Sequence, residues 1–364
     1  MIPIMEPWID QEEIDLVMDC LKTGWISSQG RYIKEFEKAF SGFCQAQYGV
    51  ATSNGTTALH LALLTLGIGP GDEVIVPALS FIATANVVAY VGARPVFADV
   101  QETTWTLDPS LLRPLINART KAIIPVHLYG HPADLDPILK LAREYRLWVI
   151  EDAAEAHGAE YGGKKVGALG DIGCFSFYGN KIISTGEGGM LVTNKAEWVE
   201  KACMLRDHGM SREKKYWHPV VGYNFRMTNI QAAIGLGQMS KLNRLIEKKR
   251  EIAGYYNKRL NQTPGIILPI EESWGKSVFW LYSLLLKPEA QKTRDDLIVH
   301  LSRAGVESRP VFYPISSMPP YQGQGNYPIS EGISRGGISL PSGGNLTRSE
   351  QDQVISLIQE FLKG

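Results

Sequence analysis

The chain has 364 residues, of which 44% are hydrophobic and 21% charged, and its formal net charge at neutral pH is -1. These values are typical of a globular protein with a large core and more than one lobe. The near-neutral charge, and the lack of a basic cluster interleaved with aromatic residues, give no reason to expect a nucleic-acid partner.

Membrane attachment and a metal centre are not expected either. The first residues, MIPIMEPWIDQEE, have no basic leader with an apolar core, and no apolar run is long enough to span a bilayer. None of the four cysteines has another at the two-residue interval of a zinc or redox site: Cys20, Cys44, Cys174 and Cys203. We therefore expect free thiols, no metal, no membrane partner and a cytoplasmic location.

The first two thirds of the chain predict an α/β domain. After a helix near Gln11 to Lys22, short apolar runs alternate with helical patterns between about residues 50 and 195. The expected strands lie at VIVP from 74, PVFADV from 95, KAIIPVHLYG from 121, LWVIEDAA from 147, DIGCFSFY from 171 and GMLVT from 189; the expected helices span Thr56 to Leu66, Phe81 to Tyr90 and Leu135 to Tyr145. Such alternation predicts a mainly parallel sheet with right-handed helical crossovers.

The remainder predicts a smaller α+β domain. A long helical pattern from about Ile230 to Leu260 leads out of the first domain. A strand near 280–286, a helix near 293–304, a proline-rich loop over 309–328 and a final helix after Thr347 follow. We accordingly predict a large domain over residues 1–240, including the N-terminal segment, and a small one over 241–364.

Lys181 is the most informative single residue. It follows the apolar run DIGCFSFY and precedes the glycine-rich turn STGEGG, so it would lie at the end of a buried strand, where α/β proteins bind ligands. A lysine in such a place can lose its proton through desolvation and form a Schiff base with an aldehyde.

Two further motifs would supply other parts of a cofactor site around Lys181. The run SNGTTAL from Ser53 places small polar residues before an apolar helix. These residues can simply cap the helix, or the free N–H groups of its first turn can bind a phosphate. The buried strand LWVIEDAA ends at Asp152, a carboxylate that can cap the next helix or pair with a protonated ring nitrogen. A phosphate cradle, an acid for a pyridinium and a Schiff-base lysine together indicate pyridoxal 5'-phosphate.

The chain resembles the DegT-type sugar aminotransferases, a family of fold type I pyridoxal phosphate enzymes. The similarity covers nearly the whole length and is carried by GWISSQGRY, SNGTTALHLAL, GDEVIVPALSFIATAN, VHLYG, IEDAAEAHGA, SFYGNKIISTGEGG, YNFRMTNIQAAIG and ESRPVFYP. The resemblance implies a large, mainly parallel sheet domain and a small C-terminal α+β domain. It also implies a homodimer or higher oligomer with active sites shared between subunits.

The resemblance assigns roles to matching residues. Lys181 would hold the cofactor and carry protons, Asp152 would pair with the ring nitrogen, and Phe81 would stack on the ring. The phosphate would be bound by Gly55, Thr56 and Ser176, and by Asn229 of a neighbouring subunit. Asn229 is equally compatible with a helix cap.

Glu155 departs from the glutamine that is usual in the broader family. A carboxylate near the phenolic oxygen of the cofactor would be repelled unless it carries a proton or meets a cation. We therefore expect Glu155 to hold a proton or to contact Lys181.

The sugar pocket has weaker signals. Arg309 has a planar fork suited to a diphosphate or a donor carboxylate, and Trp25, His218 and Tyr313 could line the hexose site or simply pack. The resemblance implies transfer of an amino group from L-glutamate to C4 of a nucleotide-linked 4-keto-6-deoxy sugar. GDP-4-keto-6-deoxy-D-mannose is the expected substrate.

Several alternatives stay open at this point. A UDP- or dTDP-linked keto sugar would need no change in the cofactor residues. A related dehydratase would carry histidine in place of Lys181. A nucleotide-dependent oxidoreductase or a phosphate-loop NTPase is disfavoured, because there is no G-x-G-x-x-G and the run GAEYGGKK lacks the Ser or Thr that should follow its first lysine. A non-catalytic member of the fold would be expected to have lost Lys181.

Overall fold

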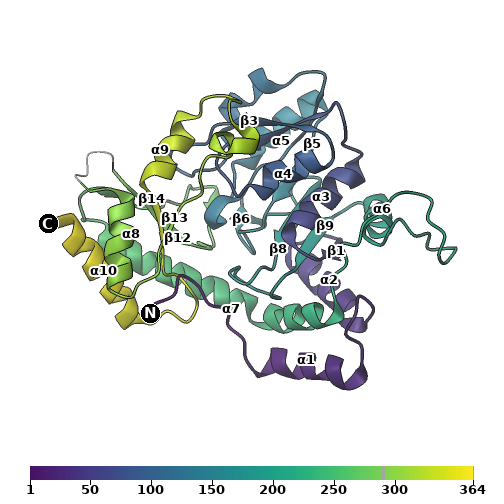
Figure 1. Ribbon diagram of the computed structural model, residues 1–364, viewed down its shortest axis with the longest axis horizontal. Coiled ribbons are helices and arrows are strands. Elements are labelled where there is room, and N and C mark those ends of the chain that lie inside the picture. The colour runs from purple at the N-terminus through teal and green to yellow at the C-terminus, as the bar shows by residue number, and fades with distance from the viewer. Residues whose placement is uncertain (288–291, 364) are drawn as a thin grey trace.

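A computed structural model describes residues 1–287 and 292–363. Its centre is a seven-stranded sheet in the order β1-β9-β8-β5-β4-β2-β3 (Figure 1). The strands are β1 (Tyr48–Thr52), β2 (Glu73–Pro77), β3 (Arg94–Ala98), β4 (Thr120–Ile123), β5 (Trp148–Asp152), β8 (Ile172–Ser176) and β9 (Gly189–Thr193). Neighbours from β3 to β8 pair in parallel, whereas β9 runs antiparallel to both β8 and β1. The prediction of a mainly parallel sheet is confirmed.

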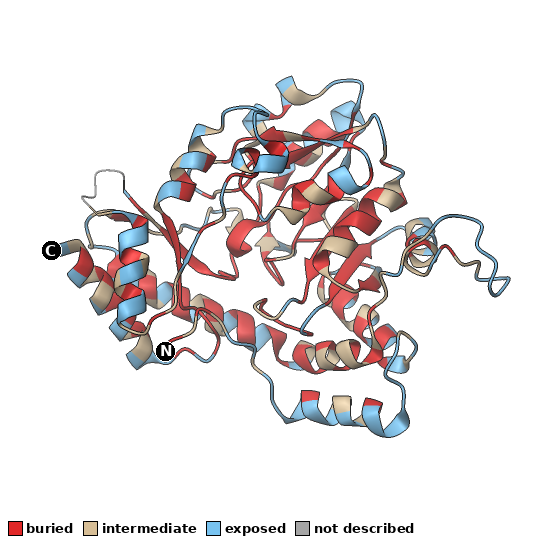
Figure 2. Ribbon diagram, in the orientation of Figure 1, coloured by how far each residue is buried: buried red, intermediate tan, exposed pale blue. Residues whose placement is uncertain are grey.

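Helices cover both faces of this sheet, and the alternation of side chains along β2 shows why. Val74 and Val76 pack into one cluster with Leu61 of α3 (Gly55–Leu66), whereas Ile75 packs into another cluster with Ile138 of α5 (Leu135–Tyr145). Successive side chains of a strand point to opposite faces, so a fully apolar strand needs cover on both. Figure 2 shows the resulting buried sheet beneath half-exposed helices. These helices are α2 (Arg31–Phe43), α3 (Gly55–Leu66), α4 (Ala83–Tyr90), α5 (Leu135–Tyr145) and α6 (Ala196–Arg206).

The C-terminal lobe contains a second sheet, which is antiparallel throughout and has the order β10-β12-β14-β13. Its strands are β10 (Ile266–Ile267), β12 (Tyr282–Leu286), β13 (Arg309–Pro310) and β14 (Gly337–Leu340), and its helices are α8 (Arg294–Arg303), α9 (Pro328–Gly336) and α10 (Arg348–Lys363). A small third sheet joins the lobes through β11 (Gly275–Lys276), which pairs with β6 (Glu160–Tyr161), itself paired with β7 (Lys164–Lys165). Short 3-10 turns lie at Pro109–Leu111, Arg113–Leu115, Leu128–Gly130, Ile315–Ser317 and Pro319–Tyr321.

Helix α7 (Asn229–Leu260) connects the lobes, and α1 (Gln11–Thr23) packs along its first part (Figure 1). The helix continues without a break through residue 240, and the first residues of the chain contact the C-terminal lobe. Ile2 forms a β-bridge with Val306, and the Ile4 N–H donates to Glu307 Oε2 over 2.9 Å. We therefore propose a domain boundary within α7, with the N-terminal residues packed on the smaller lobe.

The sequence did not predict helices α2, α6 and α9 or strands β1, β6, β7, β10, β11, β13 and β14. Two of them are informative. Strand β1 lies at the edge of the large sheet, where its antiparallel pairing with β9 decides its conformation. Helix α9 begins at Pro328, the last residue of the predicted proline-rich loop, because proline is favoured in the first turn of a helix. No helix within the described ranges combines the length and the apolar content that crossing a membrane requires.

Candidate active site

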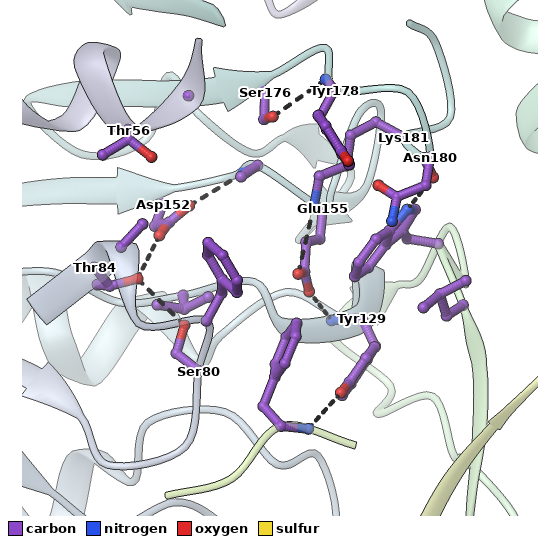
Figure 3. Close-up of a pocket in the computed structure, with 18 of the residues that line it drawn as sticks. Thr56, Ser80, Thr84, Tyr129, Asp152, Glu155, Ser176, Tyr178, Asn180 and Lys181 are labelled. Atoms are coloured by element: carbon purple, nitrogen blue, oxygen red, sulfur yellow. Dashed lines mark hydrogen bonds and ion pairs between the residues drawn. The ribbon is translucent and has the colours of Figure 1, made fainter. Parts of the chain in front are cut away.

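A cavity of about 510 Å³ lies where the parallel strands of the large sheet end and the C-terminal lobe begins (Figure 3). Carboxyl ends of parallel strands meet at one edge of a sheet, so residues far apart in the sequence gather there. The predicted site residues that line this cavity are Gly55, Thr56, Phe81, Asp152, Glu155, Ser176, Lys181 and Arg309. Both lobes thus contribute residues to one pocket.

Lys181 lies five residues beyond the end of β8 and is buried. Burial lowers the pKa of its ammonium group, and the nearby carboxylates of Glu155 and Asp152 partly oppose that effect. A lysine with a lowered pKa holds more of the neutral amine at a given pH, and the neutral amine is the nucleophile.

Asp152 ends β5 and is held by a residue that the sequence motifs did not indicate. The Thr84 hydroxyl donates to Asp152 Oδ2 over 2.7 Å, and the Ala154 N–H donates to Oδ1 over 3.2 Å. Burial raises the pKa of Asp152, and in the described part of the chain the carboxylate has no ion-pair partner. The pocket therefore offers an oriented, buried acid in need of a cation.

The start of α3 forms the predicted cradle. Asn54 is its N-cap and accepts from the Thr57 N–H over 2.9 Å, while Gly55 and Thr56 line the cavity. A side chain at Gly55 would place its Cβ 2.7 Å from the Ser176 Cβ, so only glycine lets the helix N-terminus approach the end of β8 this closely. The helix dipole and the Ser176 hydroxyl then favour an anion between them.

Glu155 contacts Lys181, as the sequence analysis expected. Its Oε1 lies 3.5 Å from Lys181 Nζ, and its Oε2 accepts from the Tyr129 N–H over 2.8 Å. Burial raises the pKa of Glu155 to about 7, although the lysine and the hydrogen bond work against that shift. Near neutral pH this carboxyl group therefore exchanges a proton readily.

Glu155→Gln is expected to stabilise the cofactor-free protein above pH 7 by about 1–3 kcal/mol. Because the folded-state pKa is raised, the favourable contribution of Glu155 is present below its unfolded-state value and is lost as the pH rises through about 7. Glutamine has no proton to lose. Thermal unfolding at pH 5 and pH 8.5 measures the effect. A variant that is no more stable than the wild type at pH 8.5 would contradict it.

Aromatic rings form one wall of the pocket. Phe81 is exposed within it, with its ring centroid 5.8 Å from that of Phe312. The Phe312 ring stacks on Tyr129 at 16° and 5.3 Å, and the Trp280 ring lies nearly parallel to Tyr129, at 11° and 6.0 Å. Only Phe81 was predicted. Tyr129, Trp280 and Phe312 sit in apolar runs that give no sign of facing a cavity.

Asn229 does not line the pocket, and its geometry speaks against the predicted contact with a neighbouring subunit. The residue is 1% exposed; Oδ1 accepts from the Tyr32 N–H over 3.1 Å, and Nδ2 donates to the Trp25 carbonyl over 2.8 Å. Both ends of the amide are thus used within its own chain. The alternative as a helix cap is wrong as well, because Thr228 caps α7.

Of the four residues predicted for the sugar site, the structure places only one on the cavity wall. Arg309 lines the cavity and pairs with Glu307 over 2.7 Å. Trp25, His218 and Tyr313 are exposed and are not among the lining residues, so their contact with a sugar stays a prediction.

These features define an enzyme pocket built around a lysine, at the strand ends of an α/β domain. The family model for the DegT/DnrJ/EryC1/StrS aminotransferase family matches residues 7–359. The chain belongs to this family, and the predicted aminotransferase class is confirmed.

Similar proteins agree with this assignment. A GDP-perosamine synthase of Caulobacter vibrioides is 48% identical, with 99% of this chain and 98% of that protein covered. The structure of Streptomyces venezuelae DesV in complex with a ketimine intermediate superposes with a TM-score of 0.92 at 36% identity, covering 97% and 95% of the two chains. A Streptococcus pneumoniae protein, assigned as a sugar aminotransferase and solved in its PLP form, gives a TM-score of 0.95 at 29% identity, covering 100% and 98%.

The pocket residues fit pyridoxal phosphate. The group has an anionic phosphate, a ring nitrogen that can be protonated and an aldehyde. The pocket has a helix N-terminus beside the Ser176 hydroxyl, the uncompensated carboxylate of Asp152 and the amine of Lys181. Each part of the cofactor thus has a matching group on the wall.

Proposed function

We propose that this chain is a pyridoxal phosphate-dependent enzyme that transfers the amino group of L-glutamate to C4 of GDP-4-keto-6-deoxy-D-mannose and forms GDP-perosamine. The observation that carries the proposal is Lys181, a buried amine beside the ionisable Glu155 in a pocket with an anion cradle. The 48% identity to a GDP-perosamine synthase, over nearly the full length of both proteins, supports the choice of substrate.

The roles of the pocket residues follow from their chemistry. When bound, the cofactor supplies an electron-withdrawing ring that stabilises negative charge on the carbon that loses a proton. Lys181 moves protons between donor, acceptor and cofactor, and Glu155 lies within 3.5 Å to exchange a proton with it. Asp152, held by Thr84, would pair with the ring nitrogen of the bound cofactor and keep it protonated. Lysine at position 181, rather than histidine, favours amino transfer over dehydration.

A panel of nucleotide-linked keto sugars tests the substrate. With glutamate as donor, we expect the GDP-linked 4-keto-6-deoxy sugar to give product, identified by its mass, with a kcat/KM at least about tenfold above that of the UDP- and dTDP-linked analogues. Pyridoxal phosphate must be present, and omitting glutamate is the control. Preference for a UDP- or dTDP-linked sugar would refute the proposed substrate but leave the aminotransferase class intact.

We also propose a homodimer with shared active sites, with Asn224 replacing Asn229 as the amide offered to the neighbouring subunit. The two residues lie in the same segment, and Asn224 is exposed, with its Oδ1 accepting from Arg226 Nε over 3.0 Å. Light scattering of the purified protein should give twice the mass of one chain, and the mass of a single chain would refute the dimer.

A further inference from the structure

The Lys181 amine has a second neighbour on the pocket wall, the indole ring of Trp280. Lys181 Nζ lies 3.7 Å from the centroid of this ring and 3.5 Å from Glu155 Oε1. An ammonium group over the face of an indole is attracted by the negative face of the ring, most strongly where water is excluded. The carboxylate and the ring thus offer the same amine two favourable contacts.

Two contacts hold the Trp280 indole in this position. Its Nε1 donates over 2.7 Å to the carbonyl of Asn180, the residue directly before Lys181. Its ring lies at 11° to the ring of Tyr129, with the centroids 6.0 Å apart. The backbone of Trp280 also packs closely on Gly130, where a Cβ would lie 2.8 Å from the Trp280 nitrogen. The indole therefore cannot move away from Lys181 without disturbing its neighbours.

Tyr129 connects Trp280 back to Glu155, because Glu155 accepts from the Tyr129 N–H over 2.8 Å. Lys181, its two neighbours and Tyr129 therefore form one connected cluster. The other ionisable groups around Lys181 lie outside this cluster. Asp152 contributes negative charge from the end of β5. His157, in the core behind, is neutral at ordinary pH because burial lowers its pKa to about 3. The cavity is also lined by Glu187 and Arg309.

We propose that Trp280 is a positioning residue that holds the Lys181 ammonium in one place whenever the lysine is not bonded to the cofactor. This inference rests on the proposed function, in which Lys181 is released, carries a proton and bonds again. Bonding would require the neutral amine: Nζ would attack the aldehyde carbon, a C=N bond would replace the C=O bond, and the oxygen would leave as water with the two hydrogens of the amine. A surface that stabilises the ammonium therefore influences the pH at which Lys181 reacts.

Fluorinated tryptophans placed specifically at position 280 test the inference. Each added fluorine weakens the negative face of the indole and leaves its shape nearly unchanged. The cofactor-free protein is mixed with pyridoxal phosphate at a series of pH values, and the rate of bonding is followed by absorbance. We expect the midpoint of the rate profile to fall stepwise with each fluorine. At pH 6 the most fluorinated protein should react up to about tenfold faster, with equal rates at high pH.

The matched control carries the same analogues at Trp274, which packs against Tyr161 and His131 outside the pocket, and its profile should not move. If the pH midpoint of the rate profile stays the same after fluorination at Trp280, the inference is overturned. A rate increase of equal size at every pH overturns it too, because that result reports easier entry of the reagent. If the wild-type protein forms no bond with pyridoxal phosphate, the proposed function fails and the inference fails with it.

Discussion

Lys181→Ala is expected to abolish the absorbance band, near the edge of the visible range, of the protein reconstituted with pyridoxal phosphate. Amino transfer should fall by at least about a thousandfold, because one substitution removes both the nucleophile and the proton carrier. The buried Glu155 would lose its nearest cation as well. Absorbance after reconstitution measures the first effect, and single-turnover formation of the amino sugar measures the second.

Lys195→Ala is the matched control, because Lys195 is an exposed lysine just after β9. It should keep both the band and the activity. Circular dichroism of the Lys181 variant checks that it is folded. A folded Lys181→Ala protein that keeps the wild-type band and turnover would disprove the central role of this residue.

Asp152→Asn should separate catalysis from stability. We expect kcat/KM to fall by about 10²–10⁴-fold, corresponding to about 3–5 kcal/mol for removing one partner of a buried charge pair. The cofactor-free protein should be at least as stable as the wild type at neutral pH. Because burial raises the pKa of Asp152, its favourable contribution is present only below its unfolded-state pKa and is lost as the pH rises.

Steady-state kinetics and the thermal midpoint of the cofactor-free protein measure these two effects. Thr84→Val provides a graded comparison, because it removes the hydroxyl that donates to Asp152 over 2.7 Å but leaves the carboxylate. Its loss of kcat/KM should be smaller than that of Asp152→Asn. If Asp152→Asn keeps wild-type kcat/KM, the carboxylate does not pair with the ring nitrogen.

Residues whose function depends on local geometry could be predicted from the sequence. Lys181 follows a buried strand and Asp152 ends another, and both reached the pocket because strand ends of a parallel sheet share an edge. The glycine at position 55 likewise marks a helix start, whose free N–H groups can bind a phosphate. In each case the informative neighbours lie within a few residues along the chain.

Residues that act across the fold could not be found this way. Trp280 comes from the segment before β12, yet its ring contacts Lys181, about a hundred positions earlier. Thr84 lies in an apolar helix pattern, and nothing near it in the sequence indicates its bond to Asp152. The motif around Asn229 suggested a contact with a neighbouring subunit, but its amide is hydrogen-bonded to the backbone of Tyr32 and Trp25. Those partners come from the N-terminal segment, far away in the sequence.

By itself, the sequence determined the class of sheet and the residues placed at strand ends, since hydrophobic periodicity and short motifs record local backbone conformation. Its resemblance to known sequences indicated the family. Only the tertiary structure decided which side chains surround the Lys181 amine. Glu155 arrives from the loop after β5, Trp280 from the second lobe and Tyr129 from a turn with φ of +52°. Such contacts depend on how distant segments pack, and packing specificity arises from the whole core rather than from any one stretch of sequence.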